Sequence, residues 1–589
     1  MKKQGKRLAC ILVALALLLG CGTAAFAAQD GVCGGACGTS PFILVRGMDA
    51  QALVLNQGTS EEKRPLSPDT QAILELVGKV AGPVARFAVD QNYDKLADGV
   101  LPVLYDFFEP LSCEPNGGSR HAVTVERYPE SMAHYPAFVG NEDFMTGEPA
   151  MIRAAAGKIG ADHVYLFTYD WRLDPMDYAR ELNDYVQRVK AETGHDKVSL
   201  AGGSFGGTII ASYLALYGSE DIDNFTMLSS AFTGTSIVSD LFTGRVEFHK
   251  AELIRILKEV AGQPAVNVLL DALDKAGILD TLMPVLDGIV EHLKDRVYDE
   301  VFQDTFVTMP GIWGLVTQKD YEEAKAYLLD PEEDAQLIAR ADAYHYGVQA
   351  KLPELLRQAM GSGVHVNVVS HYNLQGVPIT PSYREQNDNI IDTKYTSGFA
   401  TCAYLNETLP AGYRQQNTAC RDAAHNHISG DRIIDASTCL LPEQTWFLKD
   451  LTHMGYRYGT PLMDFILWLC LADRQLTVWD GGQYAQFMQV DPKAGTLTPV
   501  SAQQAEEPEP STGAPGPSAE PEETPDTTRQ PETEAQASET TPSEPDAPPM
   551  EDAEGTIADT GETALALLPL GLAAAAAVVL TAARKKRTI

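Results

Sequence analysis

The sequence predicts an α/β fold in which a mostly parallel sheet is flanked by helices. Short β-rich runs alternate with amphipathic helical patterns between residues 41 and 490. One of these runs enters a glycine-rich turn that an apolar helical segment follows. The chain has 589 residues, 44% of them hydrophobic, so one large core and several appendages are possible.

The candidate strands are short runs enriched in β-branched and aromatic residues. In residues 175–190, apolar side chains recur at helical spacing and predict a helix with one buried face, made by Tyr178, Leu182, Tyr185 and Val189. Such a helix joins parallel strands as a crossover. The candidate strands cover residues 42–45, 163–168, 198–201, 224–228 and 364–370.

Residues 239–361 interrupt this alternation with segments of helical period, among them 252–260 and 266–273. We expect an inserted helical cap within a body that spans residues 41–490. Apolar helices over a site suit a water-poor substrate, but the pattern fits equally a subdomain that only completes the core.

The amino-terminal residues 1–27 have the pattern of an export signal, with a basic start, an apolar run and small residues before Ala28. Leu18-Leu19-Gly20-Cys21 also resembles a lipoprotein box, so a lipidated Cys21 is an alternative.

The carboxyl-terminal part predicts a stalk and an anchor. Residues 501–555 are rich in Pro, Glu, Thr and Ser and lack the apolar residues that folding needs. Within 557–589, the apolar run 563–583 precedes four basic residues, as in a transmembrane segment. Residues 557–561 resemble a cell-wall sorting signal cut between Thr560 and Gly561, so wall attachment is the alternative. Both place the body outside the cell.

The formal net charge of -35 argues against a nucleic-acid partner, because phosphates are bound by clustered Lys and Arg. Nine cysteines are present, and the nearest pairs after export are Cys33 with Cys37 and Cys402 with Cys420. We predict no cofactor and no metal, since paired C-x-x-C spacing is absent and His425-x-His427 stands alone.

The turn Gly202-Gly203-Ser204-Phe205-Gly206 matches a nucleophile elbow, in which glycines flank a serine held in a strained turn. A plain glycine-rich turn or a phosphate loop would also follow a strand. The phosphate loop needs a lysine, and Thr208 follows Gly207 instead. Ser204 is therefore the predicted nucleophile.

A serine nucleophile needs a histidine base and a carboxylate to orient it, in the chain order serine, acid, histidine for this fold. We select Asp431 and His453. Asp435 is a rival acid, and Asp392 with His427 also satisfies the order.

The negative oxygen of a tetrahedral intermediate needs two backbone donors. One is the residue after the nucleophile, Phe205. The other follows an early strand that runs into Gly47, which selects the amide of Met48.

Several segments together resemble the lecithin:cholesterol acyltransferase family. The resemblance implies an α/β-hydrolase fold with a cap, acyl-ester chemistry on lipids, and a Ser204, Asp431, His453 triad. It departs at Gly203, where the family usually has His, and at Arg46, where Pro usually stands. We interpret Asp170, Trp171 and Arg172 as structural. The matching segments are 43–47, 169–172, 202–207, 231–236, 309–313, 430–431 and the surroundings of His453.

We therefore expect a cell-surface serine hydrolase that acts on lipid acyl esters, as a lipase, phospholipase or O-acyltransferase. A non-catalytic adhesin on a hydrolase scaffold and a peptidase of the same fold are the alternatives.

Overall fold

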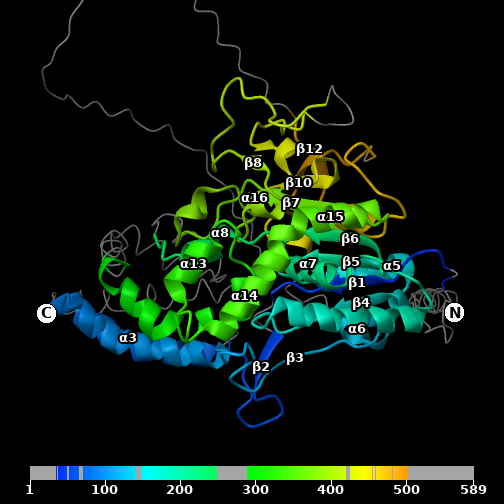
Figure 1. The fold of residues 1–589 in the computed structure, drawn as a ribbon. Coiled ribbons are helices and arrows are strands. Elements are labelled where there is room, and N and C mark those ends of the chain that lie inside the picture. Colours follow the sequence, from blue (N-terminus) through cyan, green and yellow to red (C-terminus); the bar gives the residue numbers. More distant parts are fainter. Residues whose placement is uncertain are drawn as a thin grey trace, which may run out of the picture. The chain divides into compact units, whose positions relative to one another are not determined.

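A largely parallel eight-stranded sheet forms the centre of the computed structural model (Figure 1). All neighbouring strands are parallel except the last pair at one edge, which is antiparallel. From that edge to the other, the order is β12 (Leu497–Pro499), β11 (Phe487–Val490), β10 (Thr445–Lys449), β7 (His365–Tyr372), β6 (Ile222–Leu228), β5 (Val198–Gly203), β1 (Phe42–Val45) and β4 (Val164–Phe167).

The structure describes residues 35, 37–48, 52–65, 70–140, 148–247, 288, 290–418, 425–453, 455–457, 459–480 and 482–501. The predicted signal, the anchor, nearly all of the stalk, and the cap segments 252–260 and 266–273 lie outside these residues. So do Cys21, Cys33 and Cys420. Within the described ranges, no helix combines the length and apolar character needed to cross a bilayer.

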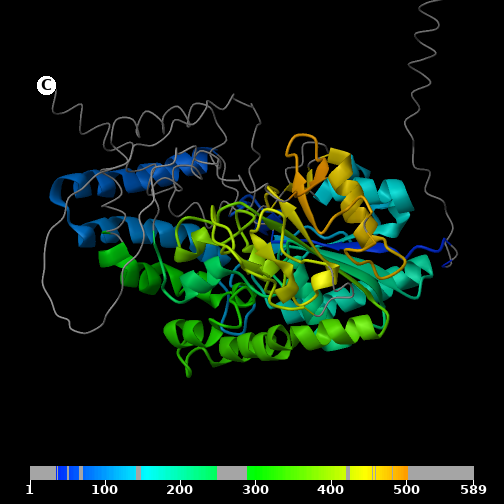
Figure 2. The same cartoon turned by 90° about the horizontal axis from the view of Figure 1, so that it is seen from above.

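Both faces of the sheet are buried, because successive strand residues point to opposite sides and each side is covered by helices. On β1, Ile43 and Val45 join one core cluster, while Phe42 and Leu44 join the other. Figure 2 shows the helix layers on opposite sides of the sheet.

The first layer contains α6 (Pro175–Thr193), α7 (Gly206–Tyr217) and α15 (Leu352–Gly361), and the second contains α5 (Glu148–Ile159) and α17 (Gly459–Cys470). The predicted inner face of α6 is buried at all four positions. The remaining α-helices are α2 (Thr70–Asp90), α3 (Tyr93–Phe108), α4 (Pro136–Val139), α8 (Ser236–Phe242), α12 (Pro310–Trp313), α13 (Tyr321–Leu328), α14 (Ala335–Gly347) and α16 (Thr393–Thr396).

All five predicted strands are present, and β10 to β12 were missed. Residues 445–449 form a short run rich in aromatic and β-branched residues, but it follows a long polar stretch outside the predicted alternation of strands and helices. Parallel pairing with β7 places β10 in the sheet. Two further two-stranded pairs lie outside the main sheet: β2 (Leu53–Leu55) with β3 (Val123–Val125), and β8 (Thr401–Cys402) with β9 (Ile434–Asp435).

Within the predicted insertion, residues 290–361 are largely helical, but they do not form a separate unit. They pack against α3, which belongs to the early part of the chain. The Phe108 and Phe306 rings lie 5.0 Å apart, and Arg296 pairs with Asp98 at 2.9 Å. The α2–α3 hairpin therefore packs against this helical region, at one end of the sheet in Figure 1. The helical period of either segment does not predict that the two associate.

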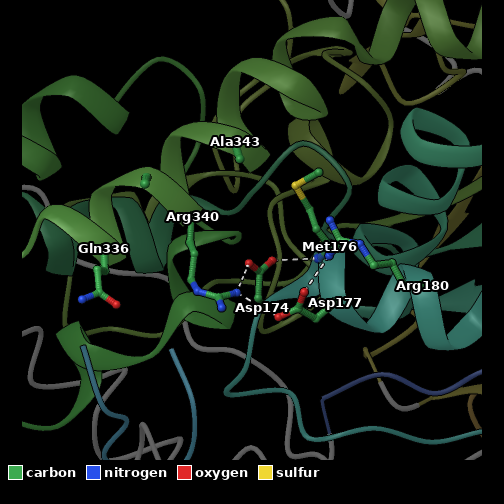
Figure 3. Close-up of a pocket in the computed structure, with 8 residues that line it drawn as sticks. Asp174, Met176, Asp177, Arg180, Gln336, Arg340 and Ala343 are labelled. Carbon is green, nitrogen blue, oxygen red and sulfur yellow. Dashed lines mark hydrogen bonds and ion pairs between the residues drawn. The ribbon is translucent and has the colours of Figure 1, made fainter. Parts of the chain in front are cut away.

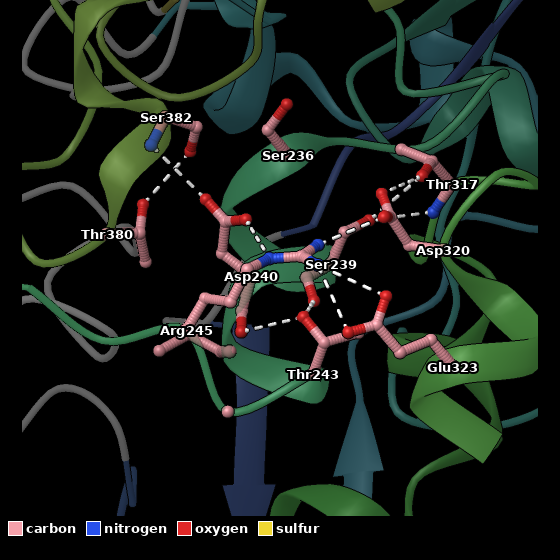
Figure 4. A network of polar contacts seen from close by, with 12 residues as sticks. Ser236, Ser239, Asp240, Thr243, Arg245, Thr317, Asp320, Glu323, Thr380 and Ser382 are labelled. Carbon is pink, nitrogen blue, oxygen red and sulfur yellow. Dashed lines mark hydrogen bonds and ion pairs between the residues drawn. The ribbon is translucent and has the colours of Figure 1, made fainter. Parts of the chain in front are cut away.

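Arg245 ties this helical region to segments close to the sheet. Its guanidinium contacts Asp240 at 2.9 Å, Asp320 at 3.0 Å and Glu323 at 3.3 Å (Figure 4). Asp240 also accepts a hydrogen bond from the Ser382 amide at 3.2 Å. One cation thus connects α8, the start of α13 and the loop after β7.

Candidate active site

Ser204 lies at the sharp turn between β5 and α7. Its φ is 50°, a left-handed value that strains any residue with a side chain. The Ser204 amide donates to the Leu228 carbonyl at 3.2 Å, and its carbonyl accepts from the Ala231 amide and the Ser230 hydroxyl, both at 3.0 Å. These bonds fix the strained turn against the end of β6.

Two glycines near Ser204 are required by close approach. A Cβ at Gly206 would lie 2.3 Å from the Val45 carbonyl oxygen, and one at Gly202 would lie 2.8 Å from the Gly207 amide. Gly203 differs, because a Cβ there would meet only the Leu228 oxygen at 3.8 Å. The turn therefore has room for a side chain at the position where the family that it resembles has histidine.

The proposed oxyanion donors lie on both sides of the serine. Phe205 follows it directly and is buried. The loop after β1 crosses close by, since a Cβ at Gly47 would lie 3.0 Å from Ser204 Cβ and 3.6 Å from its Oγ. Met48 is the next residue in that loop. In the described part of the chain, no residue accepts a hydrogen bond from the Phe205 or Met48 amide.

His453 pairs with Asp388, which the sequence interpretation did not consider. The distance from Nδ1 to the Asp388 Oδ2 is 2.6 Å, and both side chains are buried. The His453 amide also donates to the Asp388 carbonyl at 2.7 Å. With Nδ1–H donating to the carboxylate, Nε2 is the unprotonated nitrogen, which is the one that can accept a proton.

Asp431, the predicted acid, is not a partner of His453. It contacts the Ser429 hydroxyl at 2.6 Å, the Lys449 ammonium at 3.0 Å and the Tyr372 hydroxyl at 3.1 Å. These partners hold it at the ends of β7 and β10. Asp431 thus lies in a turn shortly before β10, whereas Asp388 lies in the loop after β7.

The rival residues are also engaged elsewhere. Asp435 accepts from the Tyr413 hydroxyl at 2.9 Å, and Asp392 accepts from the Ser236 amide at 2.8 Å. His427 has its Nδ1 2.9 Å from the Gln486 side-chain oxygen. Asp392 shares with Asp388 the loop after β7, but it is Asp388 that pairs with His453.

Ser229 connects the Asp388–His453 pair to the serine turn. Its hydroxyl donates to Asp388 Oδ2, and its amide donates to the Val369 carbonyl in β7 at 2.8 Å. The adjacent residues 228, 230 and 231 bind the Ser204 backbone. Ser204, Asp388 and His453 therefore lie at the same edge of the sheet, after the carboxyl ends of β5, β7 and β10.

The electrostatics of Asp388 favour its charged form. Burial alone raises the carboxyl pKa, but the His453 imidazole, its hydrogen bond, nearby His371 and the Ile391 amide outweigh burial and lower it. His371, on β7, is fully buried, and burial lowers its pKa to about 4, so this second imidazole is neutral near pH 7.

Arg172 has the structural place predicted for the 170–172 segment. It is fully buried and donates to Asp170 Oδ1 at 2.9 Å, to the Leu111 carbonyl at 2.8 Å and to the Ser119 hydroxyl at 2.9 Å. These bonds join the loop after β4 to the segment after α3.

An open hollow of about 620 Å³ lies between the start of α6 and α14 (Figure 3). Arg340 bridges it by pairing with Asp174 at 2.7 Å and Asp177 at 2.8 Å. Ser204, Asp388 and His453 are all absent from its lining. The hollow is therefore separate from the candidate active site.

No family model matches the chain, and no curated protein matches it. Among solved structures, it is similar to one described as "The crystal structure of Tle4-Tli4 complex", with 12% identity and a TM-score of 0.23. The match covers 56% of this chain and 74% of that chain. The likeness to the lecithin:cholesterol acyltransferase family thus rests on the motifs alone.

Proposed function

We propose that the chain is a serine hydrolase of the α/β-hydrolase type that cleaves acyl esters. The observation that carries the proposal is the 2.6 Å Asp388–His453 pair, linked through Ser229 to the segment that holds the Ser204 turn. A serine after β5, an acid after β7 and a histidine after the next strand in the sheet match the order of that fold.

In the proposed mechanism, His453 Nε2 takes the proton of the Ser204 hydroxyl as Oγ attacks the ester carbonyl. Asp388 keeps the imidazole in the required tautomer and stabilises the imidazolium that forms. His453 then protonates the leaving alcohol, and an acyl-enzyme remains on Ser204. The strained turn presents Oγ above the sheet without a change of backbone.

The Phe205 and Met48 amides stabilise the negative oxygen of both tetrahedral intermediates. This role is supported by the close approach of the Gly47 backbone to Ser204 and by the position of Phe205 at the start of α7. Because these donors are fixed before the substrate arrives, little reorganisation accompanies the chemical step.

Lipid esters are the substrate class that we propose. The support is the set of motifs that resemble lecithin:cholesterol acyltransferases, together with the helical region beside the sheet. Water or a lipid alcohol can resolve the acyl-enzyme with the same residues. The export-signal pattern and the apolar carboxyl-terminal run support a site on the outer face of the cell envelope.

The test is labelling of the full chain in detergent by a fluorophosphonate probe, which reacts only with an activated serine. We expect labelling of the wild type and none of Ser204→Ala. Absence of labelling in a folded wild type contradicts the proposal and favours an adhesin.

A second measurement addresses the substrate. On phospholipid vesicles with an added alcohol, we expect release of free fatty acid, formation of a new ester, or both. Cleavage of peptides without cleavage of any lipid ester would replace the lipid proposal by a peptidase.

A further inference from the structure

Three potential metal ligands, Cys37, His163 and His195, lie close together at the end of the sheet opposite the Ser204 turn. The Cys37 sulfur lies 3.2 Å from His195 Nε2 and 3.7 Å from His163 Nε2. All three ligand atoms lie within 4.8 Å of one another. The three residues are far apart in the sequence, so only the fold brings them together.

These separations fit one tetrahedral ion. With Zn–S of about 2.3 Å and Zn–N of about 2.0 Å, a tetrahedral site places sulfur about 3.6 Å from nitrogen. The two observed separations lie on either side of this value. Hydrogen bonds are the metal-free alternative, in which the thiol donates to one imidazole and accepts from the N–H of the other. Zinc loading and chelation distinguish the two arrangements.

The donors favour zinc among the common divalent ions. Thiolate and imidazole are the ligands of structural zinc sites, whereas magnesium and calcium prefer oxygen. Asp162 Oδ1 lies 3.3 Å from His163 Nδ1, the ring nitrogen that does not face Cys37. A carboxylate commonly occupies that place behind a ligating histidine, although here it does not reach hydrogen-bond geometry.

The three ligands lie in segments that lead into three adjacent strands, β1, β4 and β5. Cys37 precedes β1, His163 directly precedes β4, and His195 lies between α6 and β5. They therefore lie at the amino ends of these strands, whereas Ser204 lies at the carboxyl end of β5. His163 is buried and Cys37 is exposed, so one side of the cluster is open to water or another donor.

We propose that Cys37, His163 and His195 bind a zinc ion that fastens the segment before β1 to the sheet. The role is structural, because the ion is remote from the proposed chemistry. The metal needs the Cys37 thiolate, so the site also requires that Cys37 is not joined to Cys33 in a disulfide.

The experiment measures zinc in the full chain, purified in detergent, loaded with zinc and then dialysed. We expect one zinc per chain in the wild type and at least a tenfold loss in Cys37→Ser and in His195→Ala. Cys402→Ser, which removes a thiol remote from the cluster, should keep the metal. Cobalt in place of zinc should give a thiolate-to-cobalt absorption band in the wild type that Cys37→Ser lacks.

Thermal unfolding gives an independent reading. A chelator should lower the melting temperature of the wild type and of Cys402→Ser, and leave that of Cys37→Ser unchanged. Wild-type protein without bound zinc, equal zinc in Cys37→Ser, or a Cys33–Cys37 disulfide in its mass spectrum would each overturn the proposal. Fluorophosphonate labelling of Ser204 is measured separately, so failure of one proposal does not imply failure of the other.

Discussion

At the scale of single residues, the two buried aspartates Asp388 and Asp431 differ in their partners. Asp388 faces an imidazole, whereas Asp431 faces an ammonium and two hydroxyls. Only the first arrangement can hold a histidine in the tautomer that accepts a proton from serine.

Asp388→Asn should lower kcat for ester hydrolysis by about 10⁴-fold, because the amide can favour the wrong histidine tautomer. Asp431→Asn is the matched control and should keep kcat close to the wild type. Steady-state kinetics on a soluble ester, with circular dichroism to confirm folding, checks both. The reverse ranking would return the acid to Asp431.

The glycines beside Ser204 give a second residue-scale contrast. Gly206→Ala should destabilise the protein by about 3 kcal/mol, since its Cβ would overlap the Val45 oxygen. Gly203→Ala should change the free energy of unfolding by less than about 1 kcal/mol, because the space there is open. Urea unfolding measures both, and equal losses would contradict the close approach of β1 to α7.

The sequence predicted the elbow well because its signal is local: a strand, a glycine-flanked serine and a helix follow one another within a few residues. The carboxylate that pairs with His453 could not be found in this way. Asp388 and Asp392 lie in the same loop, and neither spacing nor composition tells which one faces His453. The hydrogen bond from Ser229, on a different strand end, makes that selection.

At the scale of elements, the same division between local and distant information holds. The α6 face was predicted from its own period, whereas β10 and the α2–α3 association depend on segments far away in the chain. Arg245 shows how such segments are joined, because its three carboxylates come from α8 and from the region at the start of α13.

Arg245→Leu should lower the free energy of unfolding by about 1 to 3 kcal/mol, since Asp240 and Asp320 would remain largely buried without their cation. Arg180→Leu is the control. Its pair with Asp177 is more than half exposed and should contribute less than about 1 kcal/mol. Chemical unfolding measures the free energy of unfolding of both variants. An equal loss in the two would show that the ion pairs of Arg245 do not hold these elements together.

At the scale of the whole molecule, buried titratable groups set how stability responds to acid. Burial lowers the pKa of His371 and of His345 to about 4, so the unfolded chain binds more protons between pH 4 and 6.5. Stability contributed by both histidines is complete above that window and is lost as the pH falls through it. Burial raises the pKa of Asp392 to about 7, which has the opposite sign over a similar range.

Between pH 4 and 6.5 we expect His371 and His345 to make the free energy of unfolding rise with pH. Asp392 opposes this rise, as do Asp174 and Glu385, whose pKa values burial also raises. Over its full window, each histidine contributes about 3 kcal/mol and Asp392 about 4 kcal/mol. His371→Leu should flatten the slope and Asp392→Asn should steepen it. Urea unfolding at four pH values in this range measures the slopes, and an unchanged slope in both variants contradicts these assignments.

The order of strands in the sheet also determines when, during synthesis, the proposed active site can form. β10 enters beside β7 only after almost all of the body has been synthesised, and His453 follows it. Pairing between such distant segments is slow, because a long loop must close before any contact repays its entropy. A chain that is still emerging therefore carries Ser204 without its base. The proposed activity begins only when β10 has paired with β7 and His453 has reached Asp388.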